Sequence, residues 1–242
     1  MHALLYAVGF LTRLPVPVSV FDDARARAES LAWYPIVGLL LGALLGGLAW
    51  LMRDLPPLLS AALLLVAWIA ATGGLHLDGL ADSADAWIGG LGDRDRTLEI
   101  MKDPRSGPAA VVVVVALLLL KFAALASLPR EAWMLLLLPP LLARTTLTAA
   151  FLTLPYVRRH GLGSALATAP RLACTVALML GGAFALTFAQ AGLVALLLAT
   201  VALTAWRQAC LHRLGGFTGD TAGALAEVVE AVVLVGVVVV SL

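Results

Sequence analysis

The chain has 242 residues, of which 62% are apolar and 13% charged, and its mean hydropathy is +0.99. A soluble domain has about 45–50% apolar and about 25% charged residues, so this composition indicates an integral membrane protein. The formal net charge of +1 argues against a nucleic-acid-binding protein, which would carry a strongly basic surface.

Long uncharged stretches predict a single integral membrane domain over residues 1–242, built as an all-α bundle of about seven spans. A crossing helix needs about 20 mostly apolar residues. The uncharged stretch at 172–206 is too long for one crossing, so a turn is predicted near Gln190. The predicted spans are, in chain order, residues 31–52, 58–76, 108–128, 132–153, 172–188, 192–206 and 222–242.

Glycines line one face of the first predicted span, at Gly38, Gly42, Gly46 and Gly47. Small residues on one face let two membrane helices approach closely. This face is therefore predicted to pack against another helix.

The basic residues are distributed unevenly between the two sides of the predicted bundle. Of the 16 Lys and Arg residues, two lie in outer connections and two within spans, which leaves twelve on one side. Short cytoplasmic loops are enriched in Lys and Arg, so this side is predicted to be cytoplasmic, with the N-terminus inside and the C-terminus outside. The acidic residues, with two exceptions, follow the same side. A multi-pass protein of the cell inner membrane is predicted, with its site facing the cytoplasm.

The first acidic cluster opens the predicted cytoplasmic loop 78–107. Asp78, Asp82 and Asp85 have the spacing i, i+4, i+7, which places them on one face of a helix. Carboxylates on one stripe repel one another unless a cation neutralises them, and oxygen ligands of this kind suit Mg²⁺. The alternative is a solvated acidic surface.

The rest of this loop mixes charges of both signs. Glu99 and Asp103 accompany Arg96, Lys102 and Arg105. Guanidinium groups match phosphate oxygens, so the basic residues are candidates for binding a nucleotide or diphosphate. Simple pairing between these neighbouring charges is equally compatible with the sequence.

A third cluster, residues 214–230, precedes and enters the last predicted span. Gly215 and Gly216 would let the backbone approach a ligand, and Asp220 would share a helix face with Glu227. Carboxylates at the start of a span are costly and usually face a cavity or a partner.

Two basic residues, Lys121 and Arg144, fall inside predicted spans and must face the bundle interior or reach its edge. They could pair with Glu227 or Glu230. Arg144 could instead contact a substrate phosphate, and the sequence leaves the two alternatives open.

The four histidines lack the spacing of a zinc site. His76 alone lies beside the acidic stripe. It is a candidate base, although a structural histidine is equally compatible.

Four ordered motifs resemble one family, the adenosylcobinamide-GDP ribazoletransferases, also called cobalamin synthases. They are FLTRLPVP at 10–17, which contains Arg13, GGLHLDGLADSAD at 73–85, RDRTLEIMKDPRSG at 94–107 and GGFTGD at 215–220. The resemblance implies a magnesium-dependent inner-membrane enzyme that joins adenosylcobinamide-GDP to α-ribazole, or to its 5′-phosphate, and releases GMP.

For such a reaction we expect Asp78, Asp82 and Asp85 to hold Mg²⁺, with Asp103 and Glu99 completing the site, and Asp82 or His76 to act as base. The expected partners are these small molecules and the lipid bilayer, with a homo-oligomer possible. Substrate contacts are expected at Arg13, Arg96, Lys102, Arg105, Arg144, Gly215, Gly216, Asp220 and Glu227.

Two other classes compete with this interpretation. Gly74, Asp78 and Asp82 fit the trailing half of the CDP-alcohol phosphotransferase pattern, but its leading half is missing. A cation transporter would place carboxylates along a membrane pathway, whereas most acids here gather in one layer.

Overall fold

The computed structural model describes residues 1–158 and 162–242. Within them the chain is helical apart from connections and one isolated pairing between Tyr156 and Phe217, which confirms the predicted all-α class. The α-helices are α1 (His2–Leu11), α2 (Ala24–Glu29), α3 (Tyr34–Leu51), α4 (Pro57–Thr72), α5 (Leu75–Gly89), α6 (Arg94–Ile100), α7 (Pro108–Ser127), α8 (Leu138–Thr153), α9 (Arg171–Leu186), α10 (Ala189–Leu214) and α11 (Gly219–Ser241); shorter 3-10 helices are η1 (Val18–Asp22), η2 (Ser30–Trp33), η3 (Arg130–Leu137) and η4 (Leu162–Thr168).

Five helical segments in the described chain are long and apolar enough to cross a membrane: Ala24–Leu51, α7, Arg130–Thr153, α10 and α11. A sixth crossing is counted if α4 and α5, which meet at an 88° bend, form one broken span. The helices α4 and α9 have 16 residues each and measure about 24 Å, less than the roughly 30 Å of a bilayer's hydrocarbon core. The membrane-capable helical bundle is confirmed, and the count of seven spans stays a prediction.

The second predicted span, residues 58–76, is interrupted by a glycine pair. Gly73 and Gly74 have φ values of +63° and +71°, a left-handed conformation that glycine adopts without a Cβ clash. The side chain of Arg13 packs on Gly73 where a Cβ would collide, and its backbone amide donates to the last turn of α4 at 2.7 Å. Because α5 leaves this bend almost at right angles to α4, the two helices do not form one straight span.

The glycine face of α3 packs as predicted against η3 and the start of α8. A Cβ on Gly42 would lie 2.7 Å from the Cα of Leu137, and a Cβ on Gly46 or Gly38 would also meet backbone atoms of these two elements. Gly47, in contrast, has nothing within 4 Å of an added Cβ. Three of the four glycines therefore permit helix contact.

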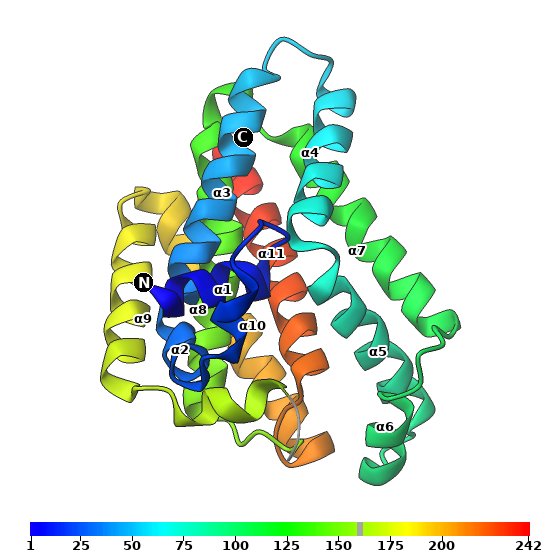
Figure 1. Cartoon of the computed structure of the whole chain (residues 1–242). Coiled ribbons are helices and arrows are strands. Elements are labelled where there is room, and N and C mark those ends of the chain that lie inside the picture. Colours follow the sequence, from blue (N-terminus) through cyan, green and yellow to red (C-terminus); the bar gives the residue numbers. More distant parts are fainter. Residues whose placement is uncertain (159–161) are drawn as a thin grey trace.

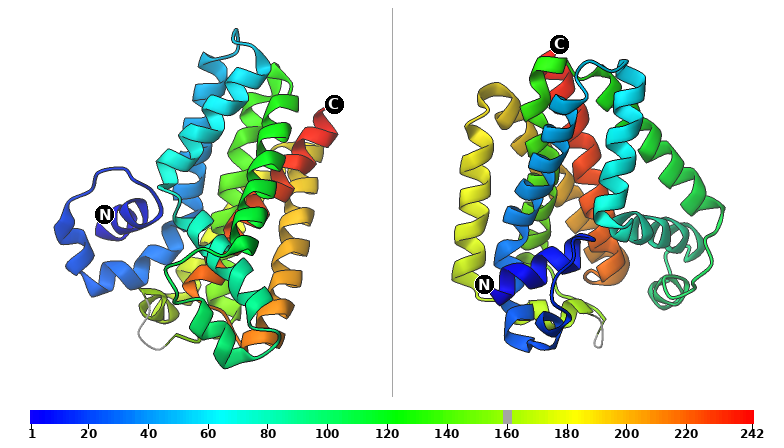
Figure 2. Two further views of the ribbon diagram at one scale, coloured as in Figure 1. Left: turned by 90° about the vertical axis from the view of Figure 1, so that its right-hand side faces the viewer. Right: turned by 45° about the horizontal axis from the view of Figure 1, so that its top comes forward.

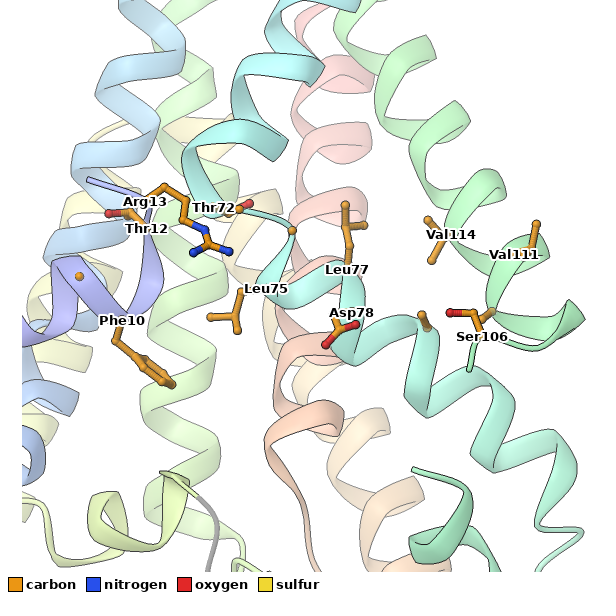
Figure 3. A pocket seen from close by; sticks show the side chains of 15 residues that line it. Phe10, Thr12, Arg13, Thr72, Leu75, Leu77, Asp78, Ser106, Val111 and Val114 are labelled. Carbon is orange, nitrogen blue, oxygen red and sulfur yellow. The ribbon is translucent and has the colours of Figure 1, made fainter. Parts of the chain in front are cut away.

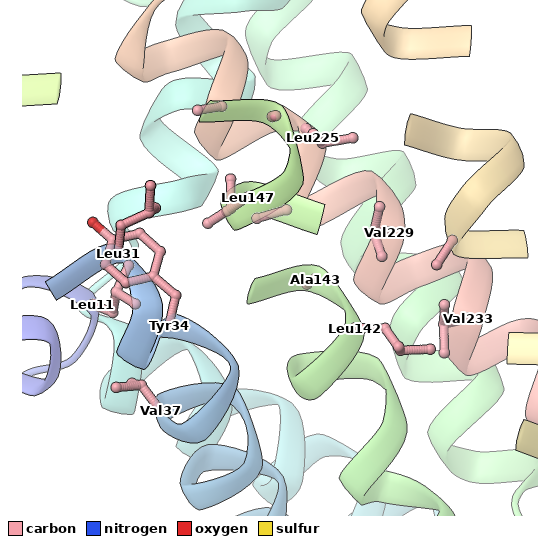
Figure 4. Packing of buried hydrophobic residues seen from close by; sticks show 14 of the residues in the cluster. Leu11, Leu31, Tyr34, Val37, Leu142, Ala143, Leu147, Leu225, Val229 and Val233 are labelled. Atoms are coloured by element: carbon pink, nitrogen blue, oxygen red, sulfur yellow. The ribbon is translucent and has the colours of Figure 1, made fainter. Parts of the chain in front are cut away.

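Helix α11 is the most enclosed of the long apolar helices. In its most apolar window 72% of residues are buried, against 22% in α7 and 17% in α10, whose outer faces are left for lipid. Figure 4 shows Val229 and Val233 of α11 facing Leu142 and Ala143 of α8. Side chains projecting from α11 can therefore reach several neighbouring helices.

The two ends of the bundle are formed by different segments of the chain. The turn between α3 and α4 and the C-terminus lie at one end, whereas α6 and the start of α11 lie at the other (Figure 1). The N-terminal segment with α1 and α2 packs on the outside of α3 (Figure 2). The segments that carry the second and third acidic clusters, α6 and the start of α11, therefore lie at the same end of the bundle.

The close contact between α3 and η3 yields a stability prediction. Gly42→Ala puts a methyl group against the Leu137 backbone, and we expect it to lower the free energy of unfolding by about 1–3 kcal/mol. Gly47→Ala adds the same methyl group in open space and should leave stability unchanged or slightly higher. Thermal unfolding in detergent measures both, and equal melting temperatures would contradict the packing argument.

Candidate active site

The acidic stripe lies on α5, beside the first turn of α11. Asp78, Asp82 and Asp85 are on a helix, as their spacing predicts, so the predicted loop 78–107 is largely helical. The two helices cross closely because Gly79 has no side chain: a Cβ there would lie 2.7 Å from the carbonyl oxygen of Asp220. This crossing brings the first and third acidic clusters together.

Asp82 shows the electrostatic effect of this crossing. Partial burial raises the pKa of its carboxyl group to about 6, and the nearby carboxylates Asp78 and Asp220 add to the increase. Arg158 opposes the increase with its positive charge. The acids repel one another, and a bound cation would relieve this repulsion.

Arg158 is a site residue that the sequence did not single out. It lies just after α8, and its guanidinium pairs with Asp220 at 2.6 Å while about a quarter of its side chain remains exposed. Arg158 lies 62 residues before Asp220 and 73 residues after Asp85, so no local sequence pattern links it to either acidic cluster. It is a basic group at the acidic cluster itself.

Two hollows open beside this cluster. An open cleft of about 680 Å³ is lined by Arg13, Asp78 and Ser106, and Figure 3 shows Arg13 and Asp78 on either side of Leu75. A smaller cavity of about 280 Å³ lies on the side of α8 and α11. Asp78, Leu75 and Phe10 line both, so the two hollows meet at Asp78. Asp82 lies one turn further along α5 and lines neither.

Asp85 has a structural role in the start of α7. Its carboxylate accepts hydrogen bonds from the backbone amides of Gly107, at 2.5 Å, and Ala110, at 2.9 Å. A helix N-terminus leaves such amides without partners, and a carboxylate satisfies them and the helix dipole. This bonding leaves Asp85 less available to a metal ion than Asp78 or Asp82.

The residues predicted from 94–107 stay apart from the acidic cluster. Arg96 and Glu99 lie on exposed α6, and Lys102 is also exposed. Asp103 pairs with Arg105 at 2.7 Å, and this hydrogen bonding lowers the pKa of the Asp103 carboxyl group to about 2. The alternative of local pairing thus applies to these two residues.

A buried ion network lies behind the acidic cluster. The Nζ of Lys121 is 2.6 Å from an oxygen of Glu227 and 2.6 Å from an oxygen of Glu230, and Arg144 contacts the other oxygen of Glu230. All four side chains are at least 95% buried. Arg144 therefore pairs with Glu230, as the first of its two predicted alternatives has it, and does not contact a substrate phosphate. Glu227 is buried as well, so neither residue lies at a surface that a substrate reaches.

The same network fixes the orientation of His76. The guanidinium of Arg144 lies 3.3 Å from Nδ1 of His76. Arginine can only donate, so Nδ1 accepts and the imidazole proton is on Nε2. His76 also lines the smaller cavity. It therefore presents a donor to the site, which disfavours its predicted role as a base.

Gly215 and Gly216, which precede α11, allow a turn and a close backbone contact. Gly215 ends α10 with a φ of +69°, and Gly216 packs against the backbone of Pro155 where no Cβ fits. The next residue, Phe217, exchanges backbone hydrogen bonds with the segment that leads to Arg158. These glycines hold Arg158 beside Asp220, and their predicted ligand contact stays a prediction.

A complete metal site made by the protein alone is absent: no three His, Cys, Asp or Glu side chains in the described ranges converge for one. Mg²⁺, however, is often held by one or two carboxylates together with waters and substrate phosphates. The crowded carboxylates of Asp78 and Asp82, which a cation would relieve, fit such a shared site. The donor set is therefore compatible with magnesium bound together with a phosphate substrate.

Comparison with known proteins gives consistent matches along the chain. The family described as cobalamin-5-phosphate synthase matches residues 3–238. Adenosylcobinamide-GDP ribazoletransferase of Stutzerimonas stutzeri (strain A1501) is 55% identical, covering 98% of this chain and 97% of the relative. The enzymes of that name from Pseudomonas paraeruginosa (strain DSM 24068 / PA7) and Pseudomonas fluorescens (strain SBW25) are 53% and 50% identical, covering 97% and 95% of this chain and 97% and 96% of theirs. No solved structure matches.

The buried ion network predicts an unequal cost of removing carboxylates. Glu230→Gln leaves Lys121 and Arg144 short of a negative partner, and we expect it to lower the free energy of unfolding by about 3–5 kcal/mol. Glu29→Gln removes a carboxylate that pairs on the surface with Arg25 and should change little. Melting temperatures in detergent test this, and a Glu230→Gln protein as stable as the Glu29→Gln control would refute it.

Proposed function

Since the chain belongs to the cobalamin-5-phosphate synthase family, we propose that it joins adenosylcobinamide-GDP to α-ribazole or its 5′-phosphate, as a transferase of cobalamin biosynthesis. One observation supports this proposal most directly. The family matches residues 3–238, and within this range Asp78 of the acidic cluster lines both hollows. In this reaction a ribazole hydroxyl oxygen forms a bond to the phosphorus next to cobinamide, the bond from that phosphorus to GMP breaks, and GMP leaves.

We assign the diphosphate to the open cleft. Arg13 lines it, and Arg158 lines the smaller cavity, which also borders Asp78, so each hollow has one guanidinium group. Guanidinium forks match phosphate oxygens. Arg105 adjoins the cleft residue Ser106 and remains a proposed phosphate contact, together with Arg96 and Lys102 on the same segment.

Asp78 and Asp82 are the proposed magnesium ligands. Magnesium bound there would neutralise the diphosphate and the charge that develops on it. Asp85 is proposed to hold the start of α7 in place beside them, since its carboxylate accepts two backbone amides. Glu99 and Asp103 would join the site only if α6 and its loop moved toward the cleft.

Asp82 is the proposed acceptor of the hydroxyl proton. Without a cation its pKa of about 6 leaves it ionised at neutral pH, and the carboxylate oxygen that does not ligate magnesium is the one proposed to accept the proton. It lines neither hollow, so we propose that one water carries the proton over the turn that separates it from Asp78. His76 donates from Nε2, and Arg144 positions it from the buried side.

The site is proposed to face the cytoplasm at the cell inner membrane. The acidic end of the bundle carries most of the basic residues, which favours the cytoplasmic side. The competing CDP-alcohol phosphotransferase would need an upstream acidic half-motif that residues 55–73 lack. A cation pathway is disfavoured because Glu227 and Glu230 are paired with bases.

The magnesium and base assignments predict loss of activity in Asp82→Asn. GMP release from adenosylcobinamide-GDP and α-ribazole should fall by about 100-fold or more, since the amide neither accepts a proton nor neutralises a cation. In the wild type, activity should rise with pH through about 6 as Asp82 ionises, and added Mg²⁺ should move this limb to lower pH. Asp95→Asn, at a fully exposed carboxylate of α6, is the control and should retain activity. Normal GMP release by Asp82→Asn in excess Mg²⁺ would overturn the assignment.

The proposed orientation places the C-terminus outside the cytoplasm. A C-terminal alkaline phosphatase fusion should be active, because this reporter folds outside the cytoplasm, and a C-terminal green fluorescent protein fusion should be dark when exported unfolded. The opposite pattern would place the C-terminus inside and require an even number of crossings.

A further inference from the structure

The smaller cavity has a composition unlike that of the open cleft. We propose, resting on the function proposed above, that this cavity binds the flat aromatic base of the nucleoside acceptor and that the open cleft takes the nucleotide-activated corrinoid. The observations that carry this assignment are the aromatic lining, the size, the polar groups and the connection to Asp78.

Aromatic rings from two separate parts of the chain line the cavity. Phe10 of α1 and Tyr34 of α3 lie with nearly parallel rings, 6.5 Å apart and at 23°. Phe151 at the end of α8 and Tyr156 just beyond it form a second pair, 6.1 Å apart and at 20°. Flat bases bind to aromatic side chains through their faces and edges, and the preference depends on the π system rather than on one base sequence. The open cleft contains only Phe10 of these four.

The volumes separate the two substrates. A cavity of about 280 Å³ is near the lower end of small-molecule sites and suits one nucleoside. A corrin macrocycle with its side chains is far larger, and only the open cleft of about 680 Å³ leaves it room to extend outward. Size alone therefore assigns the smaller substrate to the smaller space.

The polar groups of the cavity suit the sugar of a nucleoside. His76 offers its Nε2 proton, and Arg158 and Asp220 stand at the charged end.

Asp78 connects the proposed nucleoside cavity with the open cleft. This carboxylate lines both spaces, so a nucleoside with its base among the aromatic rings directs its sugar toward the point where the diphosphate lies. The two substrates would then reach the acidic cluster from two different spaces. Such an arrangement suits an in-line displacement, in which the attacking and leaving oxygens are on opposite sides of phosphorus.

The test compares Michaelis constants for each substrate in aromatic variants. Phe151→Leu and Tyr156→Leu should each raise the KM for α-ribazole about tenfold and leave the KM for adenosylcobinamide-GDP within about twofold. Tyr156→Phe keeps the ring and should restore the wild-type value. Phe184→Leu removes an aromatic ring from α9, where it lines a separate apolar groove, and serves as the matched control.

Binding without turnover gives a second readout for the same variants. Calorimetric titration of α-ribazole into detergent-solubilised protein should show weaker binding in Phe151→Leu and Tyr156→Leu, and circular dichroism establishes that they remain folded. An unchanged α-ribazole KM and affinity, or a rise confined to adenosylcobinamide-GDP, would overturn the assignment. A wild-type protein that binds α-ribazole but releases no GMP would instead refute the proposed function while the cavity assignment stands.

Discussion

The buried ion network of Lys121, Arg144, Glu227 and Glu230 determines how the central helices are arranged. An unpaired charge inside a membrane protein is costly, so Lys121 on α7 and Arg144 on α8 must both meet the carboxylates of α11. These contacts fix the rotation of α11 about its axis. The first turn of the same helix carries Asp220, whose position is therefore set by charges buried two turns and more away.

The site also depends on the bend at Gly73 and Gly74. Without two left-handed residues, α4 would continue straight and carry the acidic stripe along its own axis. The bend turns α5 across the end of the bundle, where Gly79 allows it to approach α11. The chain thereby gathers carboxylates that repel one another and that the proposed magnesium ion would neutralise.

The site consists of two hollows with different linings. The open cleft is lined by Arg13, whereas the smaller cavity is aromatic, more enclosed and bordered by Arg158. Both meet at Asp78, with His76 held in one tautomer by Arg144. A transferase with one large charged substrate and one smaller aromatic substrate requires such a division, because each substrate has to be recognised before the two react.

The sequence by itself determined the helical membrane class, the gathering of charge on one side, the packing face at Gly38, Gly42 and Gly46, and the family. These follow from composition, local periodicity and ordered motifs, which need no knowledge of distant contacts. Only the tertiary structure decided that Asp220 joins Asp78 and Asp82, that Arg158 pairs with it, that Asp85 holds the start of α7, and that Arg144 pairs with Glu230. The physical reason is that each of these contacts joins different elements, and the spacing along one helix fixes which residues share a face but not which neighbour that face meets.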